Sequence, residues 1–393
     1  MIDRRSLLGG LSLAAVGVPL LGAAGCARPV RADLASATTS PGALPVTITN
    51  NSGRPDSAVR VYIVGTDPST GEQARVAPDG TLVPVREADN VDDGFTDYSI
   101  PLGDGGTELS LPFMSGRIYF ALDARLRFKA VVDGAGRSAL QYPAGWVPSD
   151  PNYEVLHDSV EFTHDDSGMY CNTSMVDQFS VPLAIRLTGE REQATGALKE
   201  GGRAAVFDAV EADPDYSPLV VGDRLRVIAP GHGIDGGLFS ETFYDSYVDQ
   251  VWERYTAADL RVTTNAGTFT GRVDGSGRLA FDGGVAPVAR PSTRDVFFCD
   301  GALAAPNDGL TGPVAAILGA AFNRSTLLDA ADQPTSDPAA FYRHPVTNAY
   351  SRALHENTED GRAYGFAFDD VGDFASYIQD HAPTSFAVTL TPF

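Results

Sequence analysis

The stretch 161-EFTHDDSGMYCNTSMVD-177 begins and ends with a carboxylate and carries two more acidic residues in between. Hydrolysis of a glycosidic bond uses two carboxylic groups. One protonates the leaving oxygen, and the other activates water or attacks the sugar. Glu161 has suitable surroundings for the acid, because Val160 and Phe162 flank it in a strand-forming segment and would point into the core. Partial burial and the nearby charge of Asp165 would raise the pKa of Glu161, so that it keeps its proton at neutral pH.

Asp177 is harder to place from the sequence. If residues 165–168 form a hairpin turn, a three-residue loop puts Asp177 on the face of Glu161, and a four-residue loop puts it on the opposite face. Even on the right face, Asp177 lies about six positions beyond the partner of Glu161, or roughly 20 Å along a flat hairpin. Carboxyl pairs in inverting glycosidases lie only about 6.5–9.5 Å apart. The strand must therefore bend or bulge, or Asp177 must approach from beyond the pleat.

A metal site is the competing interpretation of this region. His157, Glu161 and His164 would share one face of a helix and could bind zinc. The segment is rich in strand formers, and in a strand His164 faces away from the other two. We therefore expect no metal and no cofactor.

The elements that must position these residues form a mainly β pattern. From Leu44 onward, short alternating segments separated by Gly, Pro and Asp predict a β-sandwich or barrel. After about residue 189 the pattern becomes mixed. Helices are predicted over 202–212, 240–259, 311–328 and 337–343, with Ser240 and Thr311 as N-caps. Strands are predicted over 260–273, 277–283, 363–370 and 385–393. We expect a β domain (44–189) interrupted by an α/β domain (190–342), with a return to the β domain over 343–393.

The N-terminus has the features of an export signal. Arg4 and Arg5 precede an apolar run that ends at 23-AAGC-26. Small residues before a cysteine resemble the bacterial lipobox, in which the cysteine receives a lipid, so residues 1–26 are interpreted as a signal peptide with Cys26 as the lipidation site. Residues 27–43 are predicted to be a flexible tether. We therefore expect an exported protein that is anchored to the cell membrane by a lipid or is extracellular.

The net charge limits the possible binding partners, and the cysteine content limits the possible disulfides. The formal net charge of −22 argues against a nucleic-acid partner, and it fits a neutral ligand such as a polysaccharide. Beyond Cys26, the chain has only Cys171 and Cys299. An exported protein could pair them, or they could be two separately buried thiols.

Four segments, VEFTHDDSGMYCNTSMVDQFSVPL, YDSYVDQVWERYT, AAFNRSTLL and HENTEDGRAYGFAFDDV, resemble the β-1,3-glucanases of glycoside hydrolase family 64. The segments AYGFAFDDV and SGRIYFALDARLRF also resemble thaumatin-like proteins. The resemblance implies a thaumatin-like barrel, an α/β domain and a wide cleft between them for a long β-1,3-glucan. It also implies hydrolysis with inversion and release of laminaripentaose, with Glu161 as general acid and Asp177 as general base.

Several further side chains are candidate contacts to the sugar. Two depart from the family pattern, since members commonly have Asn at the position of Asp165 and Trp at the position of Tyr170. The complete set of expected substrate contacts is Thr163, Asp165, Tyr170, Asn172, Thr173, Trp146, Arg117, Asp369 and Asp370. For the last two and Arg117, a salt-bridge network is an equal alternative to a role in an acidic cleft.

The sequence therefore predicts a monomeric, exported endo-β-1,3-glucanase. The alternative is a thaumatin-like, glucan-binding surface lipoprotein without catalytic activity. The presence of both Glu161 and Asp177 favours the enzyme, because a pure binding module has no need for the pair.

Overall fold

The structure is a computed structural model that describes residues 42–103 and 105–393. The expected signal peptide, Cys26 and residues 27–41 of the expected tether lie outside the described residues. Within the described ranges, no helix combines the length and the apolar character needed to cross a membrane. The fold is mainly β, and the first strand begins at Leu44, where the alternating pattern of the sequence begins.

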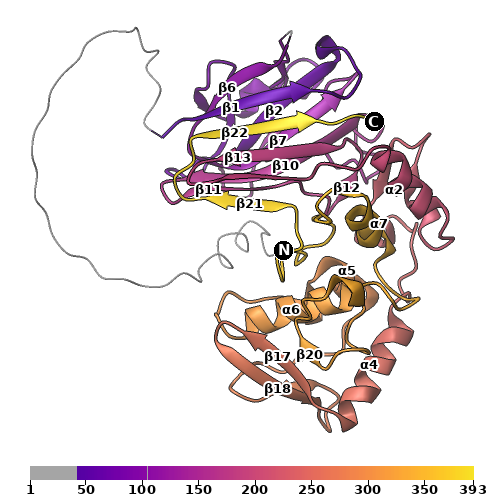
Figure 1. The fold of residues 1–393 in the computed structure, drawn as a ribbon. Coiled ribbons are helices and arrows are strands. Elements are labelled where there is room, and N and C mark those ends of the chain that lie inside the picture. Colours follow the sequence, from indigo (N-terminus) through magenta and orange to yellow (C-terminus); the bar gives the residue numbers. More distant parts are fainter. Residues whose placement is uncertain (1–41, 104) are drawn as a thin grey trace, which may run out of the picture.

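Two large sheets form the β region in the upper part of Figure 1. The first sheet contains, in spatial order, β14 (Glu192–Thr195), β13 (Leu183–Thr188), β22 (Ser385–Leu390), β1 (Leu44–Asn50) and β6 (Thr107–Leu111). The second sheet contains β21 (Tyr377–Asp380), β11 (Gly168–Asn172), β10 (Leu156–Asp165), β7 (Met114–Leu122), β2 (Val59–Thr66), β3 (Gln73–Val76) and β4 (Leu82–Pro84), with β5 (Ile100–Pro101) paired to β2. The C-terminal strand β22 lies beside the N-terminal strand β1, so both ends of the described chain belong to this region.

One hydrophobic core joins the two sheets. It includes Ile48 and Val388 from the first sheet and Ile118, Val160 and Phe162 from the second. The other face of the second sheet is only partly covered. The ribbon of β8 (Lys129–Val132) and β9 (Ser138–Gln141) packs over one end of it in a second apolar cluster. The end that this cluster leaves uncovered carries Glu161.

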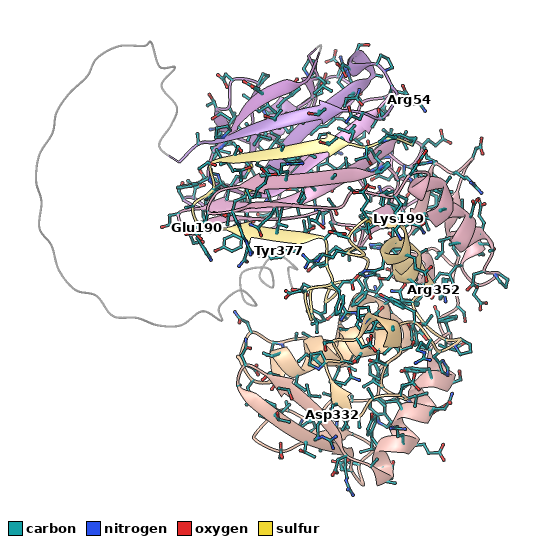
Figure 2. The ribbon with its side chains drawn as sticks, viewed as in Figure 1. Arg54, Glu190, Lys199, Asp332, Arg352 and Tyr377 are labelled. Carbon is teal, nitrogen blue, oxygen red and sulfur yellow. The ribbon has the colours of Figure 1, made fainter. Side chains whose placement is uncertain are left out.

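Most of the helical part lies below the β region in Figure 1, while its helix α2 (Gly202–Glu211) lies beside the lower strands of that region. Its other helices are α3 (Pro230–Asp235), α4 (Asp245–Ala257), α5 (Thr293–Phe298), α6 (Thr311–Asn323) and α7 (Ala349–Asn357). Its strands are β12 (Gln178–Phe179), β15 (Val220–Val221), β16 (Arg226–Ile228), β17 (Leu260–Thr264), β18 (Gly267–Val273), β19 (Leu279–Phe281) and β20 (Asp332–Gln333). The short 3-10 helices of the chain are Asp56–Ala58, Glu87–Asp89, Ser217–Leu219, Gly301–Leu303 and Pro338–Ala340. Tyr377 lies on β21, the strand of the β region nearest the helical part in Figure 2.

Most predicted helices and strands are confirmed, but several begin or end at other residues than predicted. The helix expected from residue 240 begins at Asp245, and Ser240 instead accepts a hydrogen bond from the N–H of Thr242. The helix expected to be capped by Thr311 begins at that residue, because the carboxylate of Asp308 accepts the N–H groups of Leu310 and Gly312. The helix predicted over 337–343 is only a 3-10 turn, and α7 was not predicted.

The strand predicted over 363–370 is wrong. These residues form turns, and the alternating aromatic residues that suggested a strand, Phe366 and Phe368, are both buried against α6. An apolar residue at every second position fits a strand, but it also fits a turn that inserts two rings into the same helix surface.

Of the two alternatives for Cys171 and Cys299, the structure shows two separately buried thiols and not a disulfide. Cys171 lies on β11 in the core between the two large sheets, and Cys299 follows α5 and packs against α6. Burial raises the pKa of the Cys171 thiol well above its usual value. Each thiol therefore behaves as a small apolar side chain of its own core.

Asp369 is buried at the junction of α6 and α7, so it is not available to a sugar. Its carboxylate accepts hydrogen bonds from Ser351 Oγ (3.1 Å) and the Gly365 N–H (2.9 Å), and it forms ion pairs with Arg324 and His355. Burial alone would raise the pKa of Asp369, but the charges of His355 and Arg324 outweigh it and hold that pKa below its ordinary value. The salt-bridge alternative from the sequence therefore applies to this residue.

We expect the His355–Asp369 pair to make stability depend on pH in a predictable direction. Burial lowers the pKa of His355, but Asp369 outweighs this effect and raises it. The stabilisation from a raised His pKa is complete below its unfolded value of about 6.5 and is lost as the pH rises through the folded pKa. That from the lowered Asp369 pKa is lost as the pH falls below about 4. His355→Gln should therefore cost most, about 2 kcal/mol, between these limits and less at higher pH.

Denaturant unfolding of the wild type and variant at several pH values measures this difference. His344→Gln is a matched control, since His344 packs on the Tyr247 ring and contacts the backbone of Val346. A cost of His355→Gln that is equal at every pH would contradict the prediction.

Candidate active site

Glu161 lies on the uncovered end of the second sheet, directly opposite Arg117 on the neighbouring strand β7. Because cross-strand partners have adjacent side chains, the pair is set by strand register alone. Arg117 donates from Nε and Nη2 to Glu161 Oε1, at 2.9 Å and 2.6 Å. The side chain of Glu161 is 17% exposed. Its charged neighbour is thus Arg117, whereas Asp165 is four residues along the strand, about 13 Å away.

The hairpin between β10 and β11 explains where Asp177 lies. Asp165 pairs with Gly168, and Glu161 pairs with Asn172, so the loop contains only Asp166 and Ser167. A two-residue loop has the same effect as the four-residue loop considered above. If the strand continued, Asp177 would lie on the face of the sheet opposite to Glu161. The strand instead ends at Asn172. Asp177 therefore approaches Glu161 from beyond the pleat, one of the two solutions that the sequence left open.

Two buried neighbours in the chain anchor Asp177. Met175 and Phe179 both belong to the core of the helical part, and β12, which begins immediately after Asp177, pairs with β16 of that part. The first carboxylate is thus carried by the large sheet, and the second is carried by a segment fixed to the helical part.

The two carboxylates share one guanidinium. Arg117 Nη2 is 2.6 Å from Glu161 Oε1 and 3.4 Å from Asp177 Oδ2. These two oxygens are therefore separated by at most the sum of these distances, about 6 Å. The other oxygen of Asp177, Oδ1, is 2.8 Å from His232 Nε2. Burial alone would lower the pKa of Arg117, but nearby Tyr119, Glu161 and Asp177 raise it well above its usual value, so the residue is a permanent cation.

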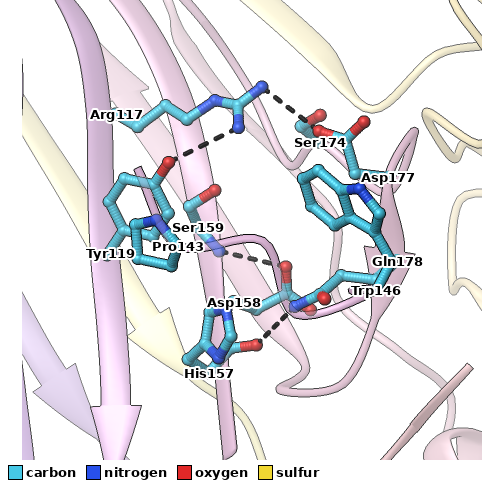
Figure 3. A pocket seen from close by; sticks show the side chains of 10 residues that line it. All are labelled: Arg117, Tyr119, Pro143, Trp146, His157, Asp158, Ser159, Ser174, Asp177 and Gln178. Carbon is cyan, nitrogen blue, oxygen red and sulfur yellow. Dashed lines mark hydrogen bonds and ion pairs between the residues drawn. The ribbon is translucent and has the colours of Figure 1, made fainter. Parts of the chain in front are cut away.

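Figure 3 shows the pocket beside these groups. Its lining residues come from β7, β10, β12 and two loops, and they are Arg117, Tyr119, Pro143, Trp146, His157, Asp158, Ser159, Ser174, Asp177 and Gln178. Burial raises the pKa of Asp158 to about 7, although the backbone N–H groups of residues 159, 180 and 181 donate to it. Burial and then the charge of Arg226 lower the pKa of His157 to about 3, so this histidine is neutral.

A fully buried arginine supports the base of this pocket. Arg226 donates to Gln178 Oε1 at 2.8 Å and to the carbonyl of Val155 at 2.5 Å. Gln178 in turn donates to the carbonyl of His157 at 3.0 Å. A Cβ atom at Gly145 would lie 1.6 Å from Arg226 Nη1, so a glycine is needed immediately before Trp146. The residues on either side of the pocket are thereby fixed to one another.

A row of polar, half-exposed side chains crosses the second sheet one step beyond Glu161. Successive strand pairings place these side chains side by side on the same face: Gln73, Thr66, Ser115, Thr163, Tyr170 and Gln379. Ser115 Oγ and Thr163 Oγ1 are 2.9 Å apart, and Gln73 Nε2 donates to Thr66 Oγ1 at 3.0 Å. This uncharged row offers hydroxyl and amide groups next to the carboxylate pair, as a sugar chain requires.

The other predicted contacts fall into two groups. Asn172 and Thr173 are buried: Asn172 Nδ2 lies 3.4 Å from Glu161 Oε2, and Thr173 Oγ1 donates to Ser376 Oγ at 2.6 Å. Both are therefore placed to support the site from behind. Asp165 accepts two hydrogen bonds from Ser167 in the hairpin turn. Trp146 stacks on His232 at 4.3 Å, so one face of its indole ring is already covered.

Asp370 stays a candidate. It is half-buried, and burial first, with Asp369 adding to the effect, raises its pKa to about 6. Burial raises the pKa of Tyr364, and the charges of Asp370 and Glu161 raise it further.

The arrangement of the histidines is that of a strand. His157 and Glu161 lie four positions apart on the same face of β10. His164 lies on the opposite face and contacts Phe113. Within the residues that the structure describes, no group of three or more His, Cys, Asp or Glu side chains is arranged to hold a metal ion.

His232 is a site residue that the sequence did not reveal. It comes from α3, more than fifty positions beyond Asp177, and the segment 230-PGHGID-235 carries no catalytic signature. The one available signal was a histidine between two glycines at a helix start, which indicates close packing but not a partner.

Comparison with known proteins identifies the family of this chain. Residues 42–390 match the family described as Beta-1,3-glucanase, glycoside hydrolase family 64. Glucan endo-1,3-beta-glucosidases of Arthrobacter sp. (strain YCWD3) and of Cellulosimicrobium cellulans are each 35% identical over 390 residues, which is 91% of this chain and 67% of theirs. A crystal structure of a laminaripentaose-producing β-1,3-glucanase in complex with laminaritetraose has a TM-score of 0.82 at 35% identity, covering 90% of this chain and 99% of that one.

A β-1,3-glucanase domain from Clostridium beijerinckii has a TM-score of 0.78 at 25% identity, covering 91% of this chain and 100% of that one. The match to the family profile runs through both large sheets, the carboxylate pair and the helical part. The chain belongs to the β-1,3-glucanases of glycoside hydrolase family 64.

Proposed function

We propose that this protein is an inverting endo-β-1,3-glucanase that cuts β-1,3-glucan into short oligosaccharides, predominantly laminaripentaose. Glu161 is the general acid and Asp177 the general base. The observation that carries the proposal is the pair of partly buried carboxylates, 17% and 15% exposed, that share Arg117 beside an uncharged polar sheet surface. A pure binding surface has no need to bring two carboxylates this close.

The two oxygens of Glu161 have different roles in this proposal. Oε1 accepts two N–H bonds from Arg117 and must stay unprotonated to do so. The transferable proton therefore belongs on Oε2, the oxygen nearer to Asn172. From there it passes to the leaving glycosidic oxygen, while Asp177 takes a proton from the water that attacks the opposite face of the sugar.

The substrate class follows from the surface around the pair. The row from Gln73 to Gln379 carries hydroxyl, phenol and amide groups without a net charge, which suits a neutral polysaccharide. The laminaripentaose-producing β-1,3-glucanase described above was crystallised in complex with laminaritetraose. The net charge of −22 makes an anionic polymer a poor competitor.

The finer organisation is also part of the proposal. We infer that the two large sheets are a thaumatin-like barrel, that the helical part is an inserted α/β domain, and that the glucan lies between them. The bounds of this domain differ from the expected 190–342, because β14 pairs with β13 in the first sheet and α7 packs into the core of the helical part. We further propose a monomer held at the outer cell surface by a lipid on Cys26. The family match and the lipobox-like 23-AAGC-26 support these inferences.

Glu161→Gln is expected to lower kcat on laminarin or curdlan by about 10²–10⁴-fold, because the amide keeps the shape but has no transferable proton. Reducing ends released by a protein that lacks residues 1–26 are the measurement. Glucan binding and the unfolding temperature should stay near the wild-type values. Exposed Glu154→Gln is the matched control. A wild type that binds glucan but releases no oligosaccharide would instead support a non-catalytic glucan-binding protein.

The first product should be the α-anomer, because an inverting enzyme delivers water to the face opposite the leaving group of a β bond. The limit of about 6 Å on the distance between the nearest carboxylate oxygens falls between the separations of retaining pairs, about 5–5.5 Å, and of inverting pairs, about 6.5–9.5 Å, so the anomer of the product must distinguish the two mechanisms. Proton NMR of fresh product, recorded before mutarotation, gives the answer. Initial β-anomer would remove Asp177 from the role of water-activating base.

Cys26→Ser should block lipidation and move the protein from the membrane fraction to the soluble fraction. Metabolic labelling with a fatty acid, followed by fractionation, tests this in cells that export the full chain. Absence of label on the wild-type protein would show that the lipid-anchor proposal is wrong.

A further inference from the structure

We propose that His232 is a positioning residue that holds the carboxylate of Asp177 in one orientation, with Oδ2 turned toward the reaction centre. This inference rests on the proposed function of Asp177. His232 Nε2 lies 2.8 Å from Asp177 Oδ1, and the His232 side chain is only 13% exposed. A buried, well-formed hydrogen bond of this kind restricts rotation of the carboxylate about its last bond.

The same short segment also binds the backbone of Asp177. The N–H of Ala229, which precedes α3, donates to the carbonyl of Asp177 at 3.0 Å. The neighbouring residues continue this contact, because Gln178 of β12 pairs with Ile228 of β16. Residues 228–232 therefore fix both the main chain and the side chain of the base.

His232 is itself held on two sides. Trp146 stacks on the imidazole at 4.3 Å with an angle of 19° between the rings, and Phe298 contacts it edge-on at 5.3 Å. The glycines that flank His232 allow this packing. A Cβ atom at Gly231 would lie 2.8 Å from the Phe298 ring, and one at Gly233 would lie 2.3 Å from Leu219. The sequence Gly-His-Gly is thus the one that brings α3 close enough for the contact.

The orientation matters for the chemistry of a base. With Oδ1 bound to His232, Oδ2 faces Arg117 and the space between the two carboxylates. In the reaction, the proton of the attacking water passes to Oδ2, and the water oxygen forms the new bond to the sugar. His232 donates to Oδ1 before and after this transfer and neither gains nor loses a proton. Its effect is therefore on kcat, while glucan affinity depends on the polar sheet surface.

Three substitutions at one position separate the hydrogen bond from the ring packing. His232→Ala removes both. His232→Phe keeps a ring against Trp146 but has no donor, and His232→Gln keeps an N–H that can reach Oδ1. We expect Ala and Phe to lower kcat on laminarihexaose about 10–100-fold, with KM within about threefold of the wild type. Gln should recover a large part of the lost rate.

A second variant tests the same link without changing the histidine. Gly231→Ala pushes α3 away from the Phe298 ring and should lower kcat, whereas Gly236→Ala meets only ordinary contacts at 3.5 Å or more and should not. Unfolding temperatures are measured for every variant. In an Asp177→Asn background, His232→Ala should change the residual rate less than about threefold, because there is no carboxylate left to orient.

The inference is overturned if His232→Phe keeps wild-type kcat, if Gln is no better than Phe, or if the loss falls on KM. It is also overturned if His232→Ala lowers the rate equally with and without Asp177. Failure of the proposed function has a different signature, since the wild type itself would then release nothing from any β-1,3-glucan.

Discussion

Two carboxyl groups whose nearest oxygens are at most about 6 Å apart and which are largely removed from water repel each other whenever both are ionised, unless a cation lies close to both. In this protein the cation is Arg117, and the rest of the site depends on where its guanidinium can reach. Its position follows from the register of β7 against β10, which makes Arg117 the direct neighbour of Glu161. A one-residue slip of β10 against β7 would turn Glu161 into the apolar core and leave Arg117 on the open face without it. The hydrophobic core between the sheets therefore fixes the electrostatics of the pair.

The two carboxylates are positioned by different physical means. Glu161 stands on a central strand, with paired neighbours on both sides, so its backbone has little freedom. Asp177 stands on an irregular segment of five residues between β11 and β12, which is held by the burial of Met175 and by pairing to β16. Irregular backbone needs more external contacts to reach the same precision. The contacts from Ala229 and His232 supply them.

This difference also decides what could be predicted from the sequence. Alternation around Val160 and Phe162 was enough to place Glu161 on the open face, because a strand has a period of two and neighbouring residues report it. Asp177 could be named only through a family resemblance, since local pattern predicts nothing once a strand has ended. His232 and Arg226 were beyond reach for the same reason, as their roles arise from pairing across 48 residues or more. For Asp369 the sequence left a sugar contact and a salt-bridge network equally open, and only its burial and ion pairs decide for the network.

The origin of the two carboxylates has a consequence for how the spacing between them is maintained. Glu161 moves with the large sheets, and Asp177 moves with the helical part, so any shift between these bodies changes the gap that the sugar bond must enter. Arg117 spans this gap electrostatically, and the buried Arg226, bound to Gln178 on one side and to the carbonyl of Val155 on the other, spans it by packing. A buried arginine whose donors bind neutral carbonyls costs desolvation energy, and two such contacts recover only part of it. Its presence directly beneath the pocket is understandable if what it stabilises is the distance between the acid and the base, and not the fold as a whole.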